Sequence, residues 1–406
     1  MQPIETTAGL TRFENRGPGT DAERRAGRWL AGELVASRHR VRIETFWCRP
    51  NWALAHAWHV ALALAGSLLA VGHPTIGAVL LAIALISALA DATVGVSPGR
   101  RLSPERASQN IIASATRATA FDQNDPRARL IITANYDAGR TGLIYRDALR
   151  RTAARIRRAT NDLAPGWHAW LAIAIAYELA VAIVRVTTHH PSSALGAIQL
   201  PPTVALVLAL ALLLEAAAAS YGPAAGDNAA GTAVAVELTR ALAADPPKNL
   251  TVELVLQGAG EDEQLGLRKY LRNRKKELTQ SNAIVLGIAA CGTGRPRYWI
   301  SDGRLIPLRY ASSLRNLAAD AGITPHRGRG ATPALPARAT GLPAIAIGCL
   351  DRLGLAPRSH QQSDTPDTLD EAATDDALML GLTLARAIDA SLTPGATNAE
   401  TTPTPA

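Results

Sequence analysis

Four long apolar segments constrain this chain more than any other feature of its sequence. Residues 51–71 and 75–94 consist mostly of Ala, Leu, Val and Ile, and residues 167–186 and 203–220 repeat the pattern. A helix needs about 20 such residues to cross the hydrocarbon core of a bilayer. The segments therefore predict four transmembrane helices, and the alternative is a set of buried core helices.

The four segments form two pairs with short connections. Gly72, His73 and Pro74 make a tight turn inside the first pair, and a weakly charged stretch rich in Pro, Ser and Thr separates the members of the second. Such residues favour turns and loops. We therefore expect two transmembrane hairpins, at residues 51–94 and 166–220.

Basic residues predict which way the hairpins point. Arg residues crowd the outer flanks of both pairs, whereas the connections inside the pairs offer only Arg185. Sequence next to membrane helices that is rich in Lys and Arg stays in the cytoplasm. We therefore expect the soluble sequence and both termini in the cytoplasm. The first 20 residues lack the apolar core of a signal peptide, which agrees with this expectation.

Charge and cysteine content exclude some partners. The net charge of +8 could suggest nucleic acid, but much of it clusters beside the apolar segments, so the expected partner is the lipid bilayer and not nucleic acid. Cys48, Cys291 and Cys349 have neither disulfide-framework nor metal-ligand spacing, which fits a reducing compartment. The sequence does not indicate an oligomeric state.

Ionisable residues inside the apolar segments need an explanation. They are His56, His59, Asp91, Glu178 and Glu215. Each such group costs about 2.5 kcal/mol or more if it is unpaired at the bilayer centre. We expect them to pair between helices for structural reasons. A transport or sensing role for the bundle has only these scattered groups in its support.

The remaining sequence is predicted to form one α/β domain that the hairpins interrupt twice, at residues 1–50, 95–165 and 221–391. A tail at residues 392–406, made of small and polar residues, should be disordered. Residues 20–37 have the apolar spacing of an amphipathic helix. Apolar runs typical of strands lie at residues 41–46, 110–113, 130–134, 250–256, 283–290, 298–301 and 343–347. Their alternation with helical patterns predicts a three-layer α/β sandwich around a largely parallel, mixed sheet.

Polar loops follow several of these strands. They contain Asn135 and Asp137, then residues 226–228, residues 260–263, and finally His360 with Asp364. In open α/β sheets, sites lie at the carboxyl ends of the strands. An Asp, a Glu and a His from separate loops could bind one divalent metal ion and leave a position open for water. Each acid could equally be a helix cap or a solvated surface charge.

Five motifs stand out in the soluble sequence: I-T-A-N-Y-D-A at 132–138, G-D-N-A-A-G-T-A-V at 226–234, Q-G-A-G-E-D-E-Q-L-G-L-R-K-Y at 257–270, G-L-P-A-I-A-I at 341–347 and S-H-Q-Q-S-D-T-P-D-T-L-D at 359–370. In this order they resemble the zinc aminopeptidase family, peptidase family M28, whose relatives include bacterial leucyl aminopeptidase, glutamate carboxypeptidase and the transferrin receptor. The resemblance implies a zinc-exopeptidase-like fold, zinc as cofactor, and a peptide or aminoacyl substrate cleaved at its amino end.

The resemblance also implies a role for each matching residue. Asp227 corresponds to the acid that bridges two zinc ions, and His360 corresponds to the last ligand. Asp137 corresponds to the acid that orients a ligand. When the third motif is aligned backwards from its last Gly and Tyr, Gly260 falls at the general base and Glu261 at a zinc ligand.

Three positions depart from the family pattern. Asn135 replaces a zinc-binding His, Ala289 or Ala290 replaces a ligating Asp, and Gly260 replaces the base. The ligands of one zinc ion persist: Asp227, Glu261 and His360. A shift of the alignment by one residue would instead make Glu261 the base and Asp262 a ligand.

Two main functions remain open. In the first, one metal ion held by these three ligands supports hydrolysis, with Glu263 or Asp262 standing in as base, so that the catalytic candidates are Glu261, Glu263 and Asp137. Loss of a general base commonly lowers a rate by about 10² to 10⁴, so catalysis should be impaired. In the second, the chain is a pseudo-peptidase that serves as a binding or scaffolding protein at the inner membrane face.

Overall fold

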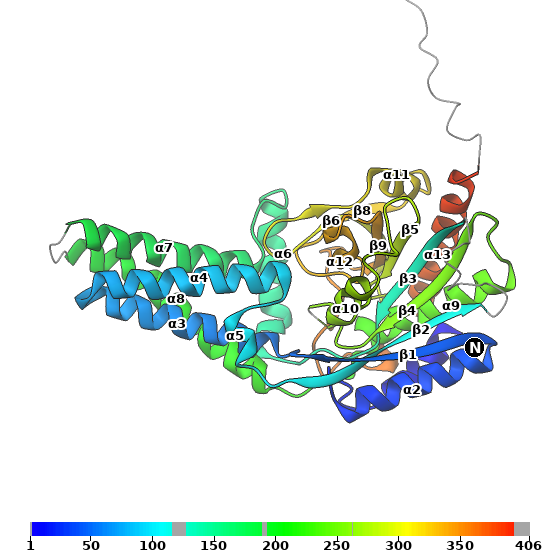
Figure 1. Cartoon of the computed structure of the whole chain (residues 1–406), viewed down its shortest axis with the longest axis horizontal. Coiled ribbons are helices and arrows are strands. Elements are labelled where there is room, and N and C mark those ends of the chain that lie inside the picture. The colour runs from blue at the N-terminus through cyan, green and yellow to red at the C-terminus, as the bar shows by residue number, and fades with distance from the viewer. Residues whose placement is uncertain (1, 116–126, 189–192, 262, 394–406) are drawn as a thin grey trace, which may run out of the picture.

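The structure, a computed structural model, describes residues 2–115, 127–188, 193–261 and 263–393. It shows an α/β domain from which a bundle of four long helices projects (Figure 1). The first helical hairpin follows strand β1 (His39–Cys48), and the second follows helix α6 (Asp147–Ala159). The tail that was expected to be disordered lies outside the described residues from position 394 onwards.

One mixed sheet organises the α/β domain. Its strand order is β1-β2-β4-β3-β5-β9-β6-β7, and β8 pairs with β6. The four central strands β4, β3, β5 and β9 run parallel, and the pairings towards both edges are antiparallel, apart from that of β8. The other strand bounds are β2 (Arg106–Ala115), β3 (Ala128–Asn135), β4 (Leu250–Gln257), β5 (Ala283–Ile288), β6 (Arg295–Asp302), β7 (Leu308–Arg309), β8 (Thr324–Arg327) and β9 (Ala344–Leu350). The predicted largely parallel, mixed sheet is confirmed.

Helices cover both faces of the sheet, which gives the predicted three layers. One apolar core joins the sheet to α1 (Pro3–Thr11), α2 (Asp21–Ala36), α9 (Ala230–Ala244), α11 (Ser312–Asp320) and α13 (Glu371–Ser391). A second core joins the other face to α10 (Leu265–Asn273) and α12 (Leu335–Ala339). Helix α2 begins as its sequence predicts, because the Thr20 hydroxyl accepts a hydrogen bond from the Glu23 amide at 3.1 Å.

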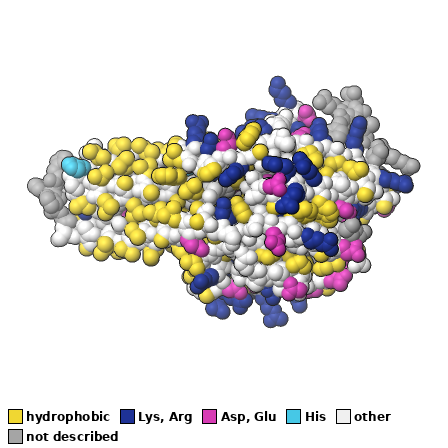
Figure 2. Space-filling view, turned by 90° about the horizontal axis from the view of Figure 1, so that it is seen from below, with side chains coloured by type: hydrophobic (Ala, Val, Ile, Leu, Met, Phe, Trp, Pro, Cys, Tyr) yellow, Lys and Arg dark blue, Asp and Glu magenta, His cyan; other side chains and the backbone are white. Residues whose placement is uncertain are grey.

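The projecting bundle contains the four apolar helices. They are α3 (Trp52–Gly72), α4 (Pro74–Val94), α7 (Trp167–Thr188) and α8 (Ser193–Ala218), and each is long and apolar enough to cross a membrane. Large hydrophobic side chains such as Leu68, Ile86, Ile173 and Leu208 are exposed on its outside. Figure 2 shows hydrophobic side chains over the bundle, whereas Lys and Arg gather over the α/β domain. An apolar exterior of this extent suits lipid better than water.

The second hairpin differs from its predicted form. Helix α8 begins at Ser193, ten positions before the segment expected at residues 203–220, and it contains Pro201 and Pro202. The prolines suggested a loop, but membrane helices tolerate them where side chains and neighbouring helices satisfy the backbone. Gln199, in this first part of α8, donates hydrogen bonds to the carbonyl and the hydroxyl of Ser67 on α3 at 2.7 and 2.8 Å.

The ionisable groups of the bundle have polar neighbours. The Glu178 carboxylate accepts hydrogen bonds from Ser67 at 3.0 Å and Thr203 at 2.7 Å. His59 Nε2 lies 2.9 Å from the Ser87 hydroxyl. His56 Nε2 lies 3.6 Å from Asp91 Oδ2, and the backbone amide of Leu143 donates to Oε2 of Glu215 at 3.0 Å.

Candidate functional site

A cavity of about 360 Å³ lies where several central strands end. Its walls include Asn135 at the end of β3, Asp227 in the turn before α9, Glu261 in the loop after β4, and His360. Parallel pairing places Asn135 opposite Gln257, so the loops after β3 and β4 leave the sheet side by side. The structure therefore brings three of the residues predicted from sequence, and the Asn that replaces a ligand, to one cavity.

Glu261 and His360 are in direct contact in this cavity. His360 Nε2 lies 3.0 Å from Glu261 Oε1. The other ring nitrogen, Nδ1, is 2.9 Å from the carbonyl oxygen of Arg140, to which it donates, and the ring stacks on Tyr145 with centroids 3.9 Å apart. With Nδ1 donating to the carbonyl, Nε2 donates to the Glu261 carboxylate in this contact. A metal ion that replaced the Nε2 proton would find the usual arrangement of a histidine ligand, with Nδ1–H held by a carbonyl.

Asp227 reaches the same cavity by a different set of bonds. Its Oδ2 accepts a hydrogen bond of 2.6 Å from the Ser359 hydroxyl. The amides of Gly226 and Asp227 both donate to Asp364, which fixes this turn, and burial raises the pKa of Asp364 to about 6. Within the described residues, the ligand atoms of Asp227, Glu261 and His360 do not form a set that lies within 4.8 Å. A shared ion would therefore draw Asp227 towards the other two.

Asp137 lies behind the cavity. It is fully buried, and its two oxygens accept hydrogen bonds from the amides of Gly260 at 3.0 Å and Glu261 at 2.9 Å. Burial raises the pKa of Asp137 to about 6. This carboxyl group thus holds the backbone of the loop that carries Glu261 and is placed to position that residue.

Glu263 points away from the cavity. Its carboxylate forms buried ion pairs with Arg304 and with Arg100, which follows the first hairpin in α5 (Pro98–Arg101). Although burial opposes ionisation, the two guanidinium groups lower the pKa of Glu263. Asp262, the other stand-in base suggested by the sequence, lies outside the described residues.

The positions that would complete a second metal site carry no ligand. Asn135 donates to Glu261 Oε2 at 3.2 Å and accepts from Asn228 at 3.0 Å. Ala289 and Ala290 line the cavity with methyl groups. At Gly260, an added Cβ would lie 2.3 Å from the Asn135 Cβ, so this backbone has no space for a glutamate side chain.

A second group of possible ligands lies between the bundle and the α/β domain. Atoms of His56, Asp91 and Glu263 lie within 4.8 Å of one another. Arg100 donates to Asp91 at 2.8 Å and pairs with Glu263, and Arg304 also pairs with Glu263. Because two guanidinium groups already balance the two carboxylates, the group does not fit an added divalent cation.

Sequence reasoning missed several cavity residues. Trp167 and His168, at the start of α7, line the cavity, so the apolar helix bundle forms part of its wall. Arg140, Tyr145 and Ser359 position the candidate ligands by the contacts described above. Ser359 belongs to the last of the five motifs, which assigned it no role, whereas the other four residues belong to no motif and are revealed only by their positions in the fold.

Comparison with known proteins finds a family match over part of the chain and a shared fold. The model of peptidase family M28 matches residues 212–385. Among solved structures, LapB from Legionella pneumophila is 10% identical, with a TM-score of 0.51 over 96% of this chain and 71% of that one. Glutaminyl cyclase from Porphyromonas gingivalis is 15% identical, with a TM-score of 0.50 over 96% and 97%. No curated protein sequence gives a significant match.

The structural similarities show a shared fold, and the family match covers the segment that contains Asp227, Glu261 and His360. The chain therefore shares its fold with these proteins and carries a segment, residues 212–385, that matches the model of peptidase family M28, together with four helices that could span a membrane.

Proposed function

We propose that this protein is a membrane-anchored metallopeptidase-family protein that binds one divalent metal ion through Asp227, Glu261 and His360 and hydrolyses aminoacyl substrates slowly. The observation that carries the proposal is the 3.0 Å contact between His360 Nε2 and Glu261 Oε1, inside a cavity that also contains Asp227. The Nδ1 contact with Arg140 supports the ligand role of His360.

The donor set favours zinc, because it combines one imidazole with two carboxylates. A zinc ion bound there would supply Lewis acidity to a substrate carbonyl. Asp137 would hold the Glu261 backbone through its two accepted hydrogen bonds. Arg140 and Tyr145 would keep the imidazole of His360 oriented.

Slow hydrolysis is expected because the described part of the cavity wall offers no spare carboxylate to act as a general base. The carboxylates that line the cavity, within the described residues, are Asp227, Glu261 and Asp302. The first two are candidate ligands, and Asp302 accepts three backbone hydrogen bonds, from Gly303, Gly330 and Thr332. Glu263 is neutralised by arginines. A general base contributes about 10² to 10⁴ in rate, so its loss predicts weak turnover.

Metal content of the full chain, purified in detergent, tests this proposal. We expect no more than one tightly bound zinc ion per chain and loss of that ion in His360→Ala. His326→Ala is a matched control, because His326 lines the same cavity but has no proposed ligand role. Two zinc ions per chain would show that the alignment of Gly260 and Glu261 is shifted, and a zinc-free protein would refute the metal site.

The second candidate function is a pseudo-peptidase that binds peptides without cleaving them. The ion pairs of Glu263 favour it, because they remove a possible base from the site. Initial rates on aminoacyl amides with added zinc separate the two functions. A slow rate that His360→Ala abolishes supports the enzyme, whereas binding without any turnover supports the pseudo-peptidase.

The location of the protein is part of the proposal. The bundle has an apolar exterior, and the Arg residues that flank the apolar segments lie at the end where it meets the α/β domain. Both hairpins extend in the same direction from this domain (Figure 1). By the distribution of arginines, the α/β domain lies in the cytoplasm and the hairpin tips lie outside.

A further inference from the structure

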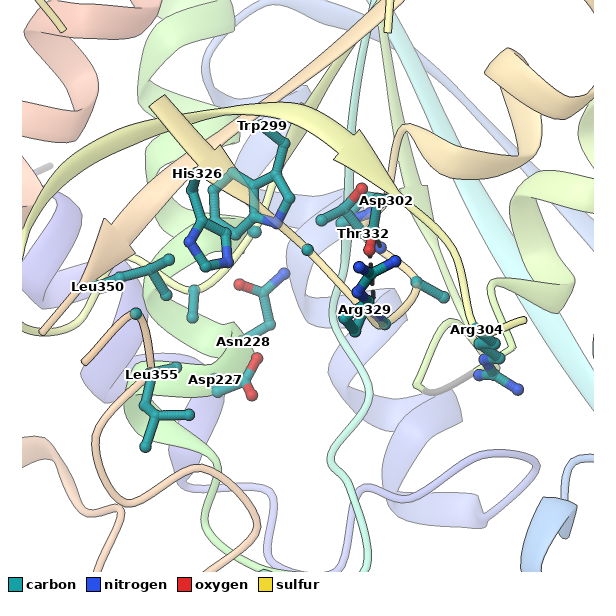
Figure 3. Close-up of a pocket in the computed structure, with 18 of the residues that line it drawn as sticks. Asp227, Asn228, Trp299, Asp302, Arg304, His326, Arg329, Thr332, Leu350 and Leu355 are labelled. Carbon is teal, nitrogen blue, oxygen red and sulfur yellow. Dashed lines mark hydrogen bonds between the residues drawn. The ribbon is translucent and has the colours of Figure 1, made fainter. Parts of the chain in front are cut away.

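One end of the cavity is basic. Arg157 on α6, Arg304 after β6 and Arg329 after β8 contribute to its wall. In Figure 3, Arg304 and Arg329 lie on the side away from His326 and Leu350. The three guanidinium groups come from separate parts of the chain, and only the fold brings them together.

Two of these arginines lack an anionic hydrogen-bond partner within the described residues. The guanidinium of Arg329 donates to the backbone carbonyl of Asp162, and its Nε is buried without a hydrogen bond. The Arg157 side chain forms neither a hydrogen bond nor an ion pair in the described part of the chain. Burial lowers the pKa of Arg157, and repulsion by Arg329 lowers it further. Arg304 differs, because Glu263 neutralises it.

Nearby carboxylates do not occupy this basic end. Asp302 is 1% exposed and directs its oxygens at the amides of Gly303, Gly330 and Thr332, between 2.7 and 2.9 Å away. Asp162 acts on Arg157 through its charge without forming an ion pair with it. A buried guanidinium nitrogen without a partner is unfavourable, and a ligand oxygen would satisfy it.

Among the described residues, the cavity offers no spare carboxylate to a positively charged ligand. Of its carboxylates, Asp227 and Glu261 are assigned to the metal in the proposed function, and the backbone satisfies Asp302. A free α-ammonium group would therefore compete with the metal ion for its ligands. A carboxylate, by contrast, matches the planar fork of a guanidinium group.

We propose that Arg157 and Arg329 form a carboxylate-binding subsite, so that the preferred ligands of this cavity are short peptides or acylated amino acids that carry an acidic group, and not peptides with a free amino end. This inference rests on the proposed function, because it assumes that the bond to be hydrolysed lies in the same cavity as the two arginines. It narrows the expected ligands to acidic ones and ranks acylated compounds above aminoacyl compounds with a free amino end.

Binding of three matched probes to the full chain in detergent tests the subsite. N-acetyl-Ala-Glu carries two carboxylates, N-acetyl-Ala-Gln-amide carries none, and Ala-Gln-amide carries a free ammonium group. Calorimetry should give about tenfold or tighter binding for the acidic probe than for the neutral one, because charge-assisted hydrogen bonds are stronger than neutral ones. Equal affinities, tightest binding of the ammonium probe, or no binding of any probe would overturn the subsite.

Arginine variants tie the preference to these two residues. Arg329→Gln and Arg157→Gln should each lower the affinity for the acidic probe about tenfold and leave the affinity for the neutral probe unchanged. Arg327→Gln and Arg158→Gln are matched controls on neighbouring exposed positions that do not line the cavity. Arg157→Gln removes no hydrogen bond, so folding should not limit that comparison. If both Arg157→Gln and Arg329→Gln still preferred the acidic probe to the neutral one, the assignment of the subsite to these arginines would be refuted.

A metal-free measurement separates this inference from the proposed function. Zinc itself could attract a carboxylate, so the probes are also measured with chelator and in His360→Ala. The acidic preference should persist there, since both arginines are intact. If zinc fails to bind but the preference remains, the metal site is wrong and the subsite stands. If zinc binds and the preference vanishes with chelator, the subsite is refuted.

Discussion

Arg100 and Glu263 form a buried salt bridge, with Nη2 of the arginine 3.1 Å from Oε1 of the glutamate. The same guanidinium donates to both oxygens of Asp91 at the end of α4, each at 2.8 Å. Glu263 is two residues from Glu261, and its amide donates to the Glu261 carbonyl at 2.8 Å. The loop that carries a candidate ligand is therefore held by a buried ion-pair network to the first apolar hairpin.

Glu263→Gln should remove the ion pairs that hold this loop to Arg100 and Arg304. Arg304 would lose its carboxylate partner and Arg100 one of two, which in a buried pair costs about 3 kcal/mol or more of unfolding free energy. Denaturation in detergent measures the loss, and zinc titration should show weaker binding because the Glu261 loop is less ordered. Glu105→Gln is the control, since its 3.7 Å pair with Arg49 is half exposed and should change stability by less than about 1 kcal/mol. Equal changes in unfolding free energy and in zinc affinity for the two substitutions would contradict a role of Glu263 in holding the loop.

Gly260→Ala tests how tightly the same loop packs. The added methyl group would meet the Asn135 Cβ at 2.3 Å, so the backbone must shift, at a cost of about 1–3 kcal/mol. Gly32→Ala on α2 is a matched control with nothing within 4 Å of the new methyl group. There the higher helix propensity of Ala should stabilise the protein by about 0.5–1 kcal/mol. Melting temperatures that move in the same direction in both variants would show that the loop has space.

Residue patterns were sufficient to predict most of the scaffold. Apolar length predicted the four long helices, and motif order predicted that Asp227, Glu261 and His360 would reach one cavity. The start of α8 was missed because Pro201 and Pro202 resemble a loop in sequence, whereas inside an apolar bundle the helix continues through them.

The wall of the cavity was harder to predict. Arg329 and Trp167 face it because separate loops and a helix of the apolar bundle converge there, and no local spacing encodes that convergence. The role of Glu263 was missed for the same reason, since its partner Arg100 is remote in sequence. Motifs report the residues that perform chemistry, whereas the residues that shape and support a site depend on tertiary contacts.

The proposed topology predicts the outcome of reporter fusions. A reporter that fluoresces only in the cytoplasm should be bright at the C-terminus and dark when inserted at His73, in the turn between α3 and α4. An enzyme that works only outside the cytoplasm should give the opposite pattern at the same two sites. A dark C-terminal fusion beside an active external reporter would reverse the orientation.

The buried Glu23 makes stability depend on pH. It is 1% exposed, and its carboxylate accepts hydrogen bonds from the amides of Gly19 and Ala259 and from the Ser108 hydroxyl. Burial, followed by repulsion from Asp137, raises its pKa from 4.5 to about 8. Because the folded pKa is the higher one, the fold favours the protonated acid. Its contribution to stability is therefore fully present below about pH 4.5 and falls as pH rises towards 8.

Glu23→Gln should remove this dependence, since the amide does not titrate. From pH 5 to pH 8 the unfolding free energy of the wild type should fall relative to that of Glu23→Gln. Above pH 8 the difference between the two proteins should be constant. Chemical denaturation at several pH values measures it. Glu277→Gln, at an exposed site, is the control and should leave the slope unchanged. A difference between wild type and Glu23→Gln that is flat over this range would mean that Glu23 is ionised in the folded protein throughout, with its three hydrogen bonds outweighing burial.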